Sequence, residues 1–96
     1  MFQFDWDPAK AASNLRKHKV DFTLAATVFA DRLATSIADD ASFVFEERWI
    51  TIGEARNGQL LVVCHTFSED DAGMHVRIIS ARPATRKEQQ QYKLGE

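Results

Sequence analysis

The chain opens on an alternation of apolar and polar residues, which gives way to a helical spacing after a few positions. Residues 2–7 alternate aromatic with polar side chains, which predicts a strand with one apolar face. Asp7 and Pro8 form a typical helix start, because Asp caps the first turn and Pro fits the first helical position. We expect this helix to run to about His18, and a second helix to cover residues 20–29.

The helical spacing also predicts which faces turn toward a core. The apolar face of the first helix holds Ala9, Ala12 and Leu15. A different face of the same helix holds Lys10, Asn14 and Lys17. The second helix has apolar residues at core spacing, namely Phe22, Ala25, Ala26 and Phe29. We expect the two helices to form a hairpin laid across a sheet.

The rest of the chain predicts four more strands, at residues 33–38, 48–53, 59–67 and 75–81. Asn57-Gly58 is the strongest turn signal and predicts a tight hairpin. The segment 39–46, which is rich in acidic residues, and the polar segment 68–74 are expected to be loops. Pro83 blocks continuation of the last strand, and the tail after it predicts a helix that Gly95 ends.

The predicted order is β-α-α-β-β-β-β-α, which favours one α+β domain over residues 1–96. In this arrangement the helical hairpin and the C-terminal helix pack on a twisted antiparallel sheet. The unbroken apolar centre of residues 59–67 is typical of an interior strand that is covered on both faces.

Composition narrows the class of protein. Apolar residues make up 45% of the chain and charged residues 27%, as in ordinary globular domains. We see no apolar run long enough to span a membrane and no signal peptide at the N-terminus. The single cysteine, Cys64, excludes an internal disulfide and a cysteine-rich zinc site, and it is more often an inert buried thiol than a nucleophile. These features predict a cytoplasmic protein.

Charge is unevenly distributed along the chain. The formal net charge is −2 and the pI is about 5.9, which counts against nucleic-acid binding. Residues 10–19 are nevertheless basic, and residues 75–93 carry five Lys or Arg against one Glu. The acidic residues gather at 39–47 and 69–71. The basic segments form one patch only if the fold brings them together.

Familiar enzyme motifs are absent from the sequence. There is no Gly-rich phosphate loop and no nucleophile elbow. The three histidines, His18, His65 and His75, lack metal-ligand spacing. We therefore expect neither a metal nor a cofactor.

Three arginines of the predicted strands, Arg48, Arg77 and Arg82, are the main candidates for chemistry. Arginine binds phosphate through two parallel charged hydrogen bonds. By simple alternation, Arg82 lies on the opposite face of its strand from Arg77. The alternative is that these arginines lie on a solvated face, or pair with Glu47 or Glu54.

Metal-independent RNA cleavage needs cations at the phosphorus, a base for the 2′-hydroxyl and an acid for the leaving oxygen. The sequence offers three candidate acids or bases, His65, Glu47 and Tyr92. His65 can equally be a strand histidine bonded to the backbone, and Tyr92 a packing residue. Lys10, Asn14 and Lys17, with His18 beyond them, could contact RNA or form a solvated face. Trp6 and Trp49 could stack on bases, although core packing is the more common role.

The sequence resembles the BrnT toxin family over nearly its whole length. The matching segments are FDWDPAKAASNLRKHKVDF at 4–22, VFAD at 28–31, EER at 46–48 followed by ITIG at 50–53, LLVVCHT at 60–66, and VRIISARPAT at 76–85 with Glu88 and Tyr92. Their combination and order are far more specific than any one segment.

This resemblance implies a RelE-like fold and a ribonuclease toxin of a type II toxin–antitoxin system, which cleaves RNA and arrests growth. It implies an antitoxin partner of the ribbon-helix-helix type, BrnA, through which the complex binds operator DNA. The positions that match the family's basic and polar residues are Lys17, His18, Arg48, Arg77, Arg82 and Tyr92, with Glu47 and Thr85 close by. We expect RNA to be bound by Lys10, Lys17, His18, Thr85 and Arg86.

The chain departs from the family pattern at three places. Lys19 stands where the family usually has Gly, which predicts a differently shaped turn. Pro83 replaces a commonly basic residue, and residues 89–91 are Gln where the family is Arg-rich. Lost phosphate contacts weaken RNA binding.

The leading hypothesis is a metal-independent endoribonuclease in which Arg48, Arg77 and Arg82 converge on the phosphate, with Glu47 or His65 assisting proton transfer. The lost charge supports the alternative, an inactive homologue that serves as an antitoxin-binding module in operator repression.

Overall fold

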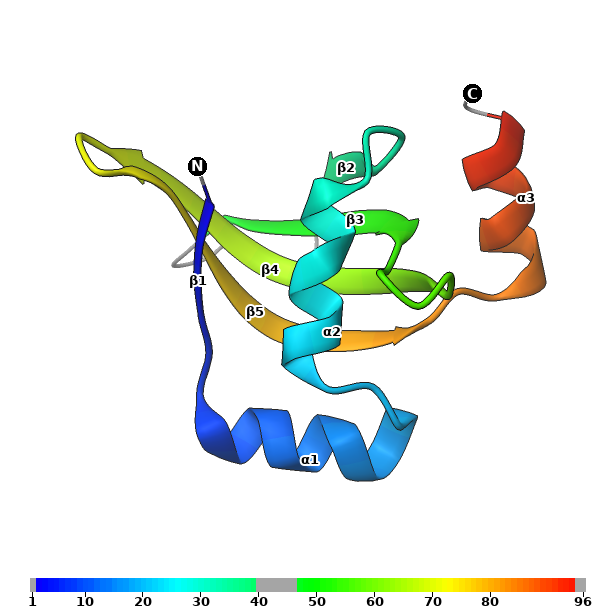
Figure 1. Ribbon diagram of the computed structural model, residues 1–96, viewed down its shortest axis with the longest axis horizontal. Coiled ribbons are helices and arrows are strands. Elements are labelled where there is room, and N and C mark those ends of the chain that lie inside the picture. Colours follow the sequence, from blue (N-terminus) through cyan, green and yellow to red (C-terminus); the bar gives the residue numbers. More distant parts are fainter. Residues whose placement is uncertain (1, 40–46, 95–96) are drawn as a thin grey trace.

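A five-stranded sheet forms the centre of the protein (Figure 1). The computed structural model describes residues 2–39 and 47–94. Its elements in order are β1 (Phe2–Asp5), α1 (Pro8–His18), α2 (Phe22–Ala26), the short 3-10 helix η1 (Thr27–Ala30), β2 (Thr35–Ala38), β3 (Arg48–Glu54), β4 (Leu60–Asp70), β5 (Gly73–Pro83) and α3 (Arg86–Leu94). The α+β class and the order of elements are confirmed. The predicted acidic loop at 39–46 lies almost wholly outside the described residues.

The strand order in the sheet is β1-β5-β4-β3-β2. All pairs are antiparallel except β1 with β5, which is parallel. The prediction of a wholly antiparallel sheet is wrong at this edge. The physical reason is that no hairpin joins these two strands, so no short turn sets their relative direction.

The polar loop predicted at residues 68–74 is largely strand. β4 continues to Asp70 and β5 begins at Gly73, so a tight turn replaces the loop. Figure 1 shows this hairpin extending beyond the rest of the sheet. Polar residues suit a strand there, because the ladder supplies the backbone hydrogen bonds while the side chains reach water. The hairpin predicted at Asn57-Gly58 is present, and Gly58 adopts a φ of 89°.

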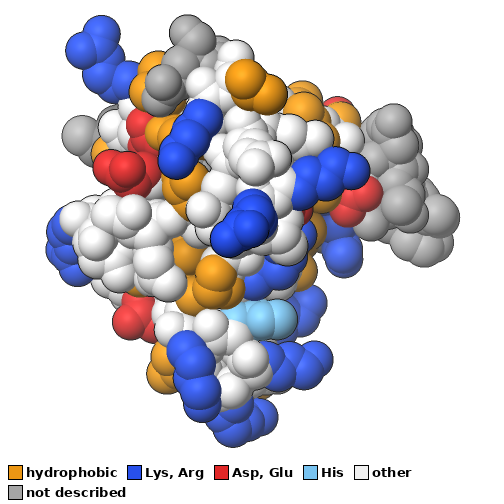
Figure 2. Space-filling view, turned by 90° about the vertical axis from the view of Figure 1, so that its right-hand side faces the viewer, with side chains coloured by type: hydrophobic (Ala, Val, Ile, Leu, Met, Phe, Trp, Pro, Cys, Tyr) orange, Lys and Arg blue, Asp and Glu red, His pale blue; other side chains and the backbone are white. Residues whose placement is uncertain are grey.

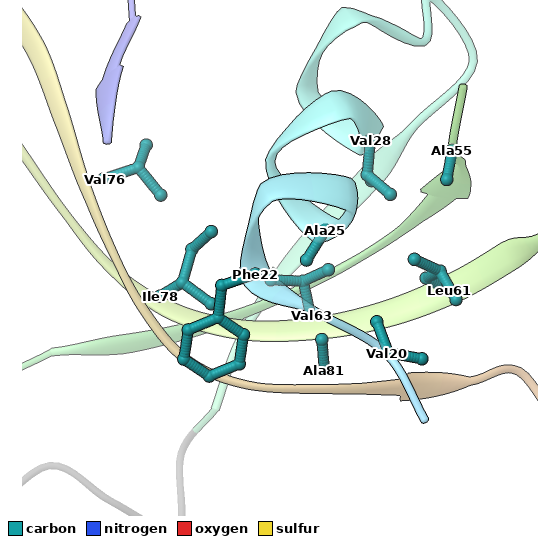
Figure 3. Packing of buried hydrophobic residues seen from close by; sticks show 10 residues of the cluster. All are labelled: Val20, Phe22, Ala25, Val28, Ala55, Leu61, Val63, Val76, Ile78 and Ala81. Atoms are coloured by element: carbon teal, nitrogen blue, oxygen red, sulfur yellow. The ribbon is translucent and has the colours of Figure 1, made fainter. Parts of the chain in front are cut away.

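One face of the sheet, here called the covered face, carries the core. α2 and η1 lie across it, and Figure 3 shows Phe22, Ala25 and Val28 pointing from them toward β4 and β5. Leu61 and Val63 meet these side chains from β4 and are fully buried. Removing a buried ring such as that of Phe22 costs about 3–5 kcal/mol. The opposite face of the sheet is here called the open face.

α1 lies beside the sheet and does not cross it (Figure 1). It takes the place of a neighbouring strand along the part of β5 that β1 does not reach. Asn14 is 5% exposed. Its amide donates to the carbonyl of Ala81 at 2.8 Å and accepts from the amide of Ala81 at 3.0 Å, as a neighbouring strand would. It also donates to the carbonyl of Val20 at 3.0 Å.

The contacts of Asn14 reverse the predicted orientation of α1. The apolar face that was expected to turn toward the core, with Ala9, Ala12 and Leu15, is instead exposed. The predicted hairpin of two helices on the sheet is therefore wrong for α1. Leaving the buried backbone groups of the β5 edge without hydrogen bonds would cost more free energy than exposing three apolar side chains.

Lys19 ends α1 in the left-handed conformation, with a φ of 60°. Its amide donates to the carbonyl of Leu15 at 3.0 Å. This is the geometry that glycine adopts most easily at such a position. The turn therefore keeps a glycine-like shape, at a cost of about 1–2 kcal/mol for the lysine.

α3 docks at the far end of the sheet through its polar residues. Thr85 and Glu88 form a capping box, in which each side chain accepts from the other residue's amide, at 2.9 and 3.2 Å. Tyr92 donates to Asp31 at 2.6 Å. No described residue of α3 is buried. Among the described residues, no helix is long and apolar enough to cross a membrane.

Candidate functional site

A β-bulge puts Arg77 and Arg82 on the same face of the sheet. His65 pairs with Ile78 and Cys64 pairs with Ser80, so Ile79 is an extra residue in β5. The extra residue shifts the alternation of side chains by one position. The prediction that Arg77 and Arg82 face opposite sides is therefore wrong, and both lie on the open face.

Arg48 and Arg77 lie in one cross-strand row on the open face. Thr66 pairs with Arg48 of β3 on one side and with Arg77 of β5 on the other. Two interstrand spacings separate the arginine backbones, which is about 10 Å. Arginine side chains are long enough to span that distance, so this register allows both guanidinium groups to approach one phosphate over Thr66.

Arg77 also forms an ion pair with Asp5 of β1 at 3.2 Å. The Arg77 and Asp5 side chains are 51% and 70% exposed, respectively. Exposed pairs of this kind contribute only about 0–1 kcal/mol. Asp5 therefore orients Arg77, and the guanidinium of Arg77 can still leave Asp5 to bind a phosphate at little cost.

Cys64 connects this row with α1. Burial raises the pKa of the Cys64 thiol, Arg48 and Lys10 lower it, and the negative charge of Asp39 adds to the rise. Charges from β3 and α1 thus both act on Cys64. A thiol with a raised pKa is a poor nucleophile, in agreement with the inert role predicted for Cys64.

α1 contributes three basic residues beside the same part of β5. Lys10, Lys17 and His18 line a pocket of about 180 Å³ whose floor includes Ser80. Ser80 is the cross-strand neighbour of Cys64. Figure 2 shows Lys and Arg side chains gathered with a histidine at the foot of the view, the level of α1 in Figure 1. We call this surface, made of Lys10, Lys17, His18, Arg48 and Arg77, the basic face.

Arg82 does not join the row formed by Arg48 and Arg77. It pairs with Val62, four residues along β4 from Thr66, which is about 13 Å. Its guanidinium makes two bonds to Glu88, at 2.8 and 2.9 Å. These bonds hold the pKa of Glu88 at about 2 and raise the pKa of Arg82. The expected convergence of three arginines is therefore wrong for Arg82, because the carboxylate of Glu88 in α3 already binds both terminal nitrogens of its guanidinium.

His65 and Tyr92 lie away from the basic face. His65 is 2% exposed on the covered face, where it bonds Thr51 at 2.7 Å, and burial lowers its pKa. The hydroxyl of Tyr92 is bonded to Asp31 at the far end of the sheet. The prediction that His65 or Tyr92 acts as an acid or base beside the arginine row is therefore wrong, because neither side chain faces a phosphate held over Thr66.

The remaining predicted residues divide between the two ends of the sheet. Glu47 is exposed and directly precedes Arg48. Thr85 caps α3 and Arg86 is exposed in its first turn, so both lie near Arg82. Trp6 packs against Phe22, with ring centroids 5.8 Å apart, which confirms its core role. Sequence analysis missed Asp5, Thr66 and Ser80, whose places depend on strand register.

Among residues 2–39 and 47–94, no group of three or more His, Cys, Asp or Glu side chains could hold a metal ion.

Comparison with known proteins gives a family match and structural matches. The family model described as "Ribonuclease toxin, BrnT, of type II toxin-antitoxin system" matches residues 6–88. The crystal structure of the ribonuclease toxin BrnT of Brucella abortus is similar, with a TM-score of 0.64 and 22% sequence identity. That alignment covers 90% of this chain and 100% of the Brucella chain. No curated protein matches the sequence.

Proposed function

This chain belongs to the BrnT family of ribonuclease toxins of type II toxin–antitoxin systems, and we propose that it is an endoribonuclease that cleaves RNA on its basic face without a metal ion. The observation that supports this proposal most directly is the row of Arg48, Thr66 and Arg77 across three neighbouring strands. Two guanidinium groups at that spacing can hold one phosphodiester from both sides.

In the proposed reaction, a base removes the proton of the ribose 2′-hydroxyl, whose oxygen attacks the adjacent phosphorus. The bond to the 5′-oxygen breaks, and that oxygen takes a proton as it leaves. Arg48 and Arg77 neutralise the charge that builds on the phosphoryl oxygens. Groups fixed in advance around such a charge typically contribute 10²–10³-fold in rate each.

Glu47 is the proposed proton acceptor. It is exposed next to Arg48, whereas His65 is buried on the covered face and Tyr92 is bonded to Asp31. Lys10, Lys17 and His18 would bind the RNA backbone on the α1 side of the scissile phosphate. Each such contact strengthens the salt dependence of RNA binding.

The residues near α3 have a supporting role in this proposal. Arg82 and Thr85 hold α3 through Glu88, and Arg86 offers only a peripheral contact for RNA. The alternative of an inactive homologue depended on the glutamines that replace basic residues in α3. Because α3 lies at the opposite end of the sheet from the arginine row, that replacement does not affect the row (Figure 1). This position favours an active enzyme.

The family also supports a cellular setting for the proposal. An antitoxin of the ribbon-helix-helix type, similar to BrnA, would neutralise the toxin and carry the complex to operator DNA. Cleavage of cytoplasmic RNA would arrest growth when the antitoxin is missing.

The test is cleavage of RNA by the purified protein in excess EDTA. We expect cleavage to persist in EDTA and to be lost in the double variant R48A/R77A. The matched control is R56A, which removes an exposed arginine from the hairpin between β3 and β4. Full cleavage by the folded double variant, or dependence on added Mg²⁺, would refute the proposed mechanism.

A further inference from the structure

A second pocket lies on the covered face, where β4 and β5 extend beyond the rest of the sheet. Its volume is about 260 Å³, slightly below the ~300–1,000 Å³ of pockets that hold drug-sized ligands. It is therefore suited to a single ring system. Its walls are almost entirely aromatic or thioether groups, from Phe2, Phe29, Trp49, Phe67 and Met74. Ser36 and His65 form one polar corner.

The hydrogen bonds of this polar corner run in one direction. Nδ1 of His65 lies 3.0 Å from the carbonyl oxygen of Thr66, which can only accept, so Nδ1 carries the proton. Burial lowers the pKa of His65, which favours the neutral ring, and a neutral ring with its proton on Nδ1 accepts through Nε2. The Thr51 hydroxyl, 2.7 Å away, donates to Nε2. The Ser36 hydroxyl, 2.6 Å from Thr51, must then donate to Thr51.

This direction determines what Ser36 can offer to a bound group. Its only proton points to Thr51, so its hydroxyl presents lone pairs to the pocket. A matching occupant is an aromatic ring that carries one hydrogen-bond donor. Trp and Tyr side chains have this combination, and both are common anchors at protein interfaces.

The charge around the pocket distinguishes protein from RNA as the occupant. None of its lining residues, all of them described, is Lys or Arg. Glu69 lies two residues beyond Phe67 on the same face, opposite Met74. RNA binding depends on cations at the phosphates, so this rim disfavours RNA. It favours a protein segment with Lys or Arg beside the inserted ring.

We propose that this pocket binds a Trp or Tyr side chain of the antitoxin, with a neighbouring Lys or Arg of the antitoxin at Glu69. The identification of the partner as an antitoxin rests on the proposed function. The pocket and the basic face are on opposite faces of the sheet. Anchoring of the antitoxin is therefore separable from RNA cleavage by mutation.

The chemistry of the pocket is tested with short peptides. NMR titration of the ¹⁵N-labelled protein would compare acetyl-Lys-Trp-Lys-amide with the same peptide containing 1-methyltryptophan, and with acetyl-Glu-Trp-Glu-amide. We expect the methyl group to weaken binding about fivefold, because it removes one hydrogen bond. We expect the Glu peptide to bind about two- to fivefold more weakly at low salt.

Two variants assign these differences to residues. S36A should remove the effect of the indole methyl group, and E69Q should reduce the preference for the Lys peptide. Titration with the trinucleotide ApApA tests the other class of ligand. Equal binding of both indoles, absence of saturable shifts at Trp49 and Phe67, or tighter binding of ApApA in the pocket would overturn the proposal.

The second measurement uses the cognate antitoxin, co-expressed with toxin variants. F67A removes a rim side chain that is 39% exposed, and we expect it to weaken the complex at least tenfold. The matched control is I37S, which alters a 59% exposed residue of the open face. Loss of the complex in I37S but not in F67A would place the antitoxin elsewhere. RNA cleavage by free F67A is measured in parallel, so failure of the enzyme hypothesis and failure of the docking hypothesis are distinguishable.

Discussion

β5 carries an arginine near its middle and another near its C-terminal end, in different settings. Arg77 lies near the projecting hairpin and has one exposed contact with Asp5. Arg82 lies beside α3 and makes two bonds to Glu88, which is itself fixed by the capping box. Both arginines are on the open face of one strand, yet only Arg77 can exchange its partner for a phosphate at little cost. Residue type and strand position alone do not identify a catalytic arginine, because its partners decide what it can do.

The largest expected effect is on catalysis. R77A should lower kcat/KM for RNA cleavage by about 10²–10³-fold, because it removes one of two cations at the phosphate. The free energy of unfolding should change by less than about 0.5 kcal/mol, since the side chain is exposed. Steady-state cleavage assays and urea unfolding measure the two quantities. If R82A remains folded and loses as much cleavage activity as R77A, the two arginines do not differ in their catalytic roles.

The second effect is on stability at the C-terminal end of β5. R82A should reduce the free energy of unfolding by about 1 kcal/mol after allowance for partial exposure, because it breaks the paired bonds to Glu88. In a domain of this size that loss lowers Tm by about 4–8 °C. R82K is the control, since it keeps the charge but loses the fork. Thermal unfolding of R82A at an unchanged Tm would show that the pair does not hold α3.

A third measurement uses pH to isolate the same pair. The pKa of Glu88 is lowered from 4.5 to about 2, so its contribution is complete above pH 4.5 and is lost as pH falls toward 2. At pH 6 the wild type should exceed E88Q by about 1 kcal/mol in unfolding free energy. This difference should close progressively below pH 4.5. Urea unfolding at several pH values measures it, and a difference independent of pH would contradict the assignment.

The smallest effect is expected at Asp5. D5N releases Arg77 from its exposed ion pair, so cleavage should rise or fall by no more than about twofold and stability by less than about 0.5 kcal/mol. The same assays as for R77A apply. A tenfold loss of cleavage in D5N would mean that Asp5 positions Arg77 more strictly than an exposed pair implies.

Features with a strong local cause were predictable from the sequence. Asp7 caps α1 through a bond of 2.8 Å to the amide of Ala9, as the Asp-Pro pair predicts. The Asn57-Gly58 turn and the apolar strand after it follow from turn chemistry and strand composition. Membership of the family followed from the order of motifs along the chain.

Features that depend on partners far along the chain were not predictable. The bulge at Ile79 contains no glycine, so nothing in the sequence of β5 marks the change of face between Arg77 and Arg82. Asn14 appeared to belong to a solvated helix face, because its partner at Ala81 is 67 residues away. The pairing of Arg82 with Glu88 depends on how α3 docks, which local spacing does not determine.

The parallel pairing of β1 with β5 also bears on how the protein is made. β1 is the first strand to be synthesised, but its partner is the last strand of the sheet. At about 5–20 residues per second, a ribosome needs several seconds to complete the intervening chain. The ion pair of Asp5 with Arg77, and the Asn14 edge beside it, therefore form only after β5 has been synthesised. A growing polypeptide without β5 lacks the assembled basic face, so an antitoxin has no complete target before that strand is made.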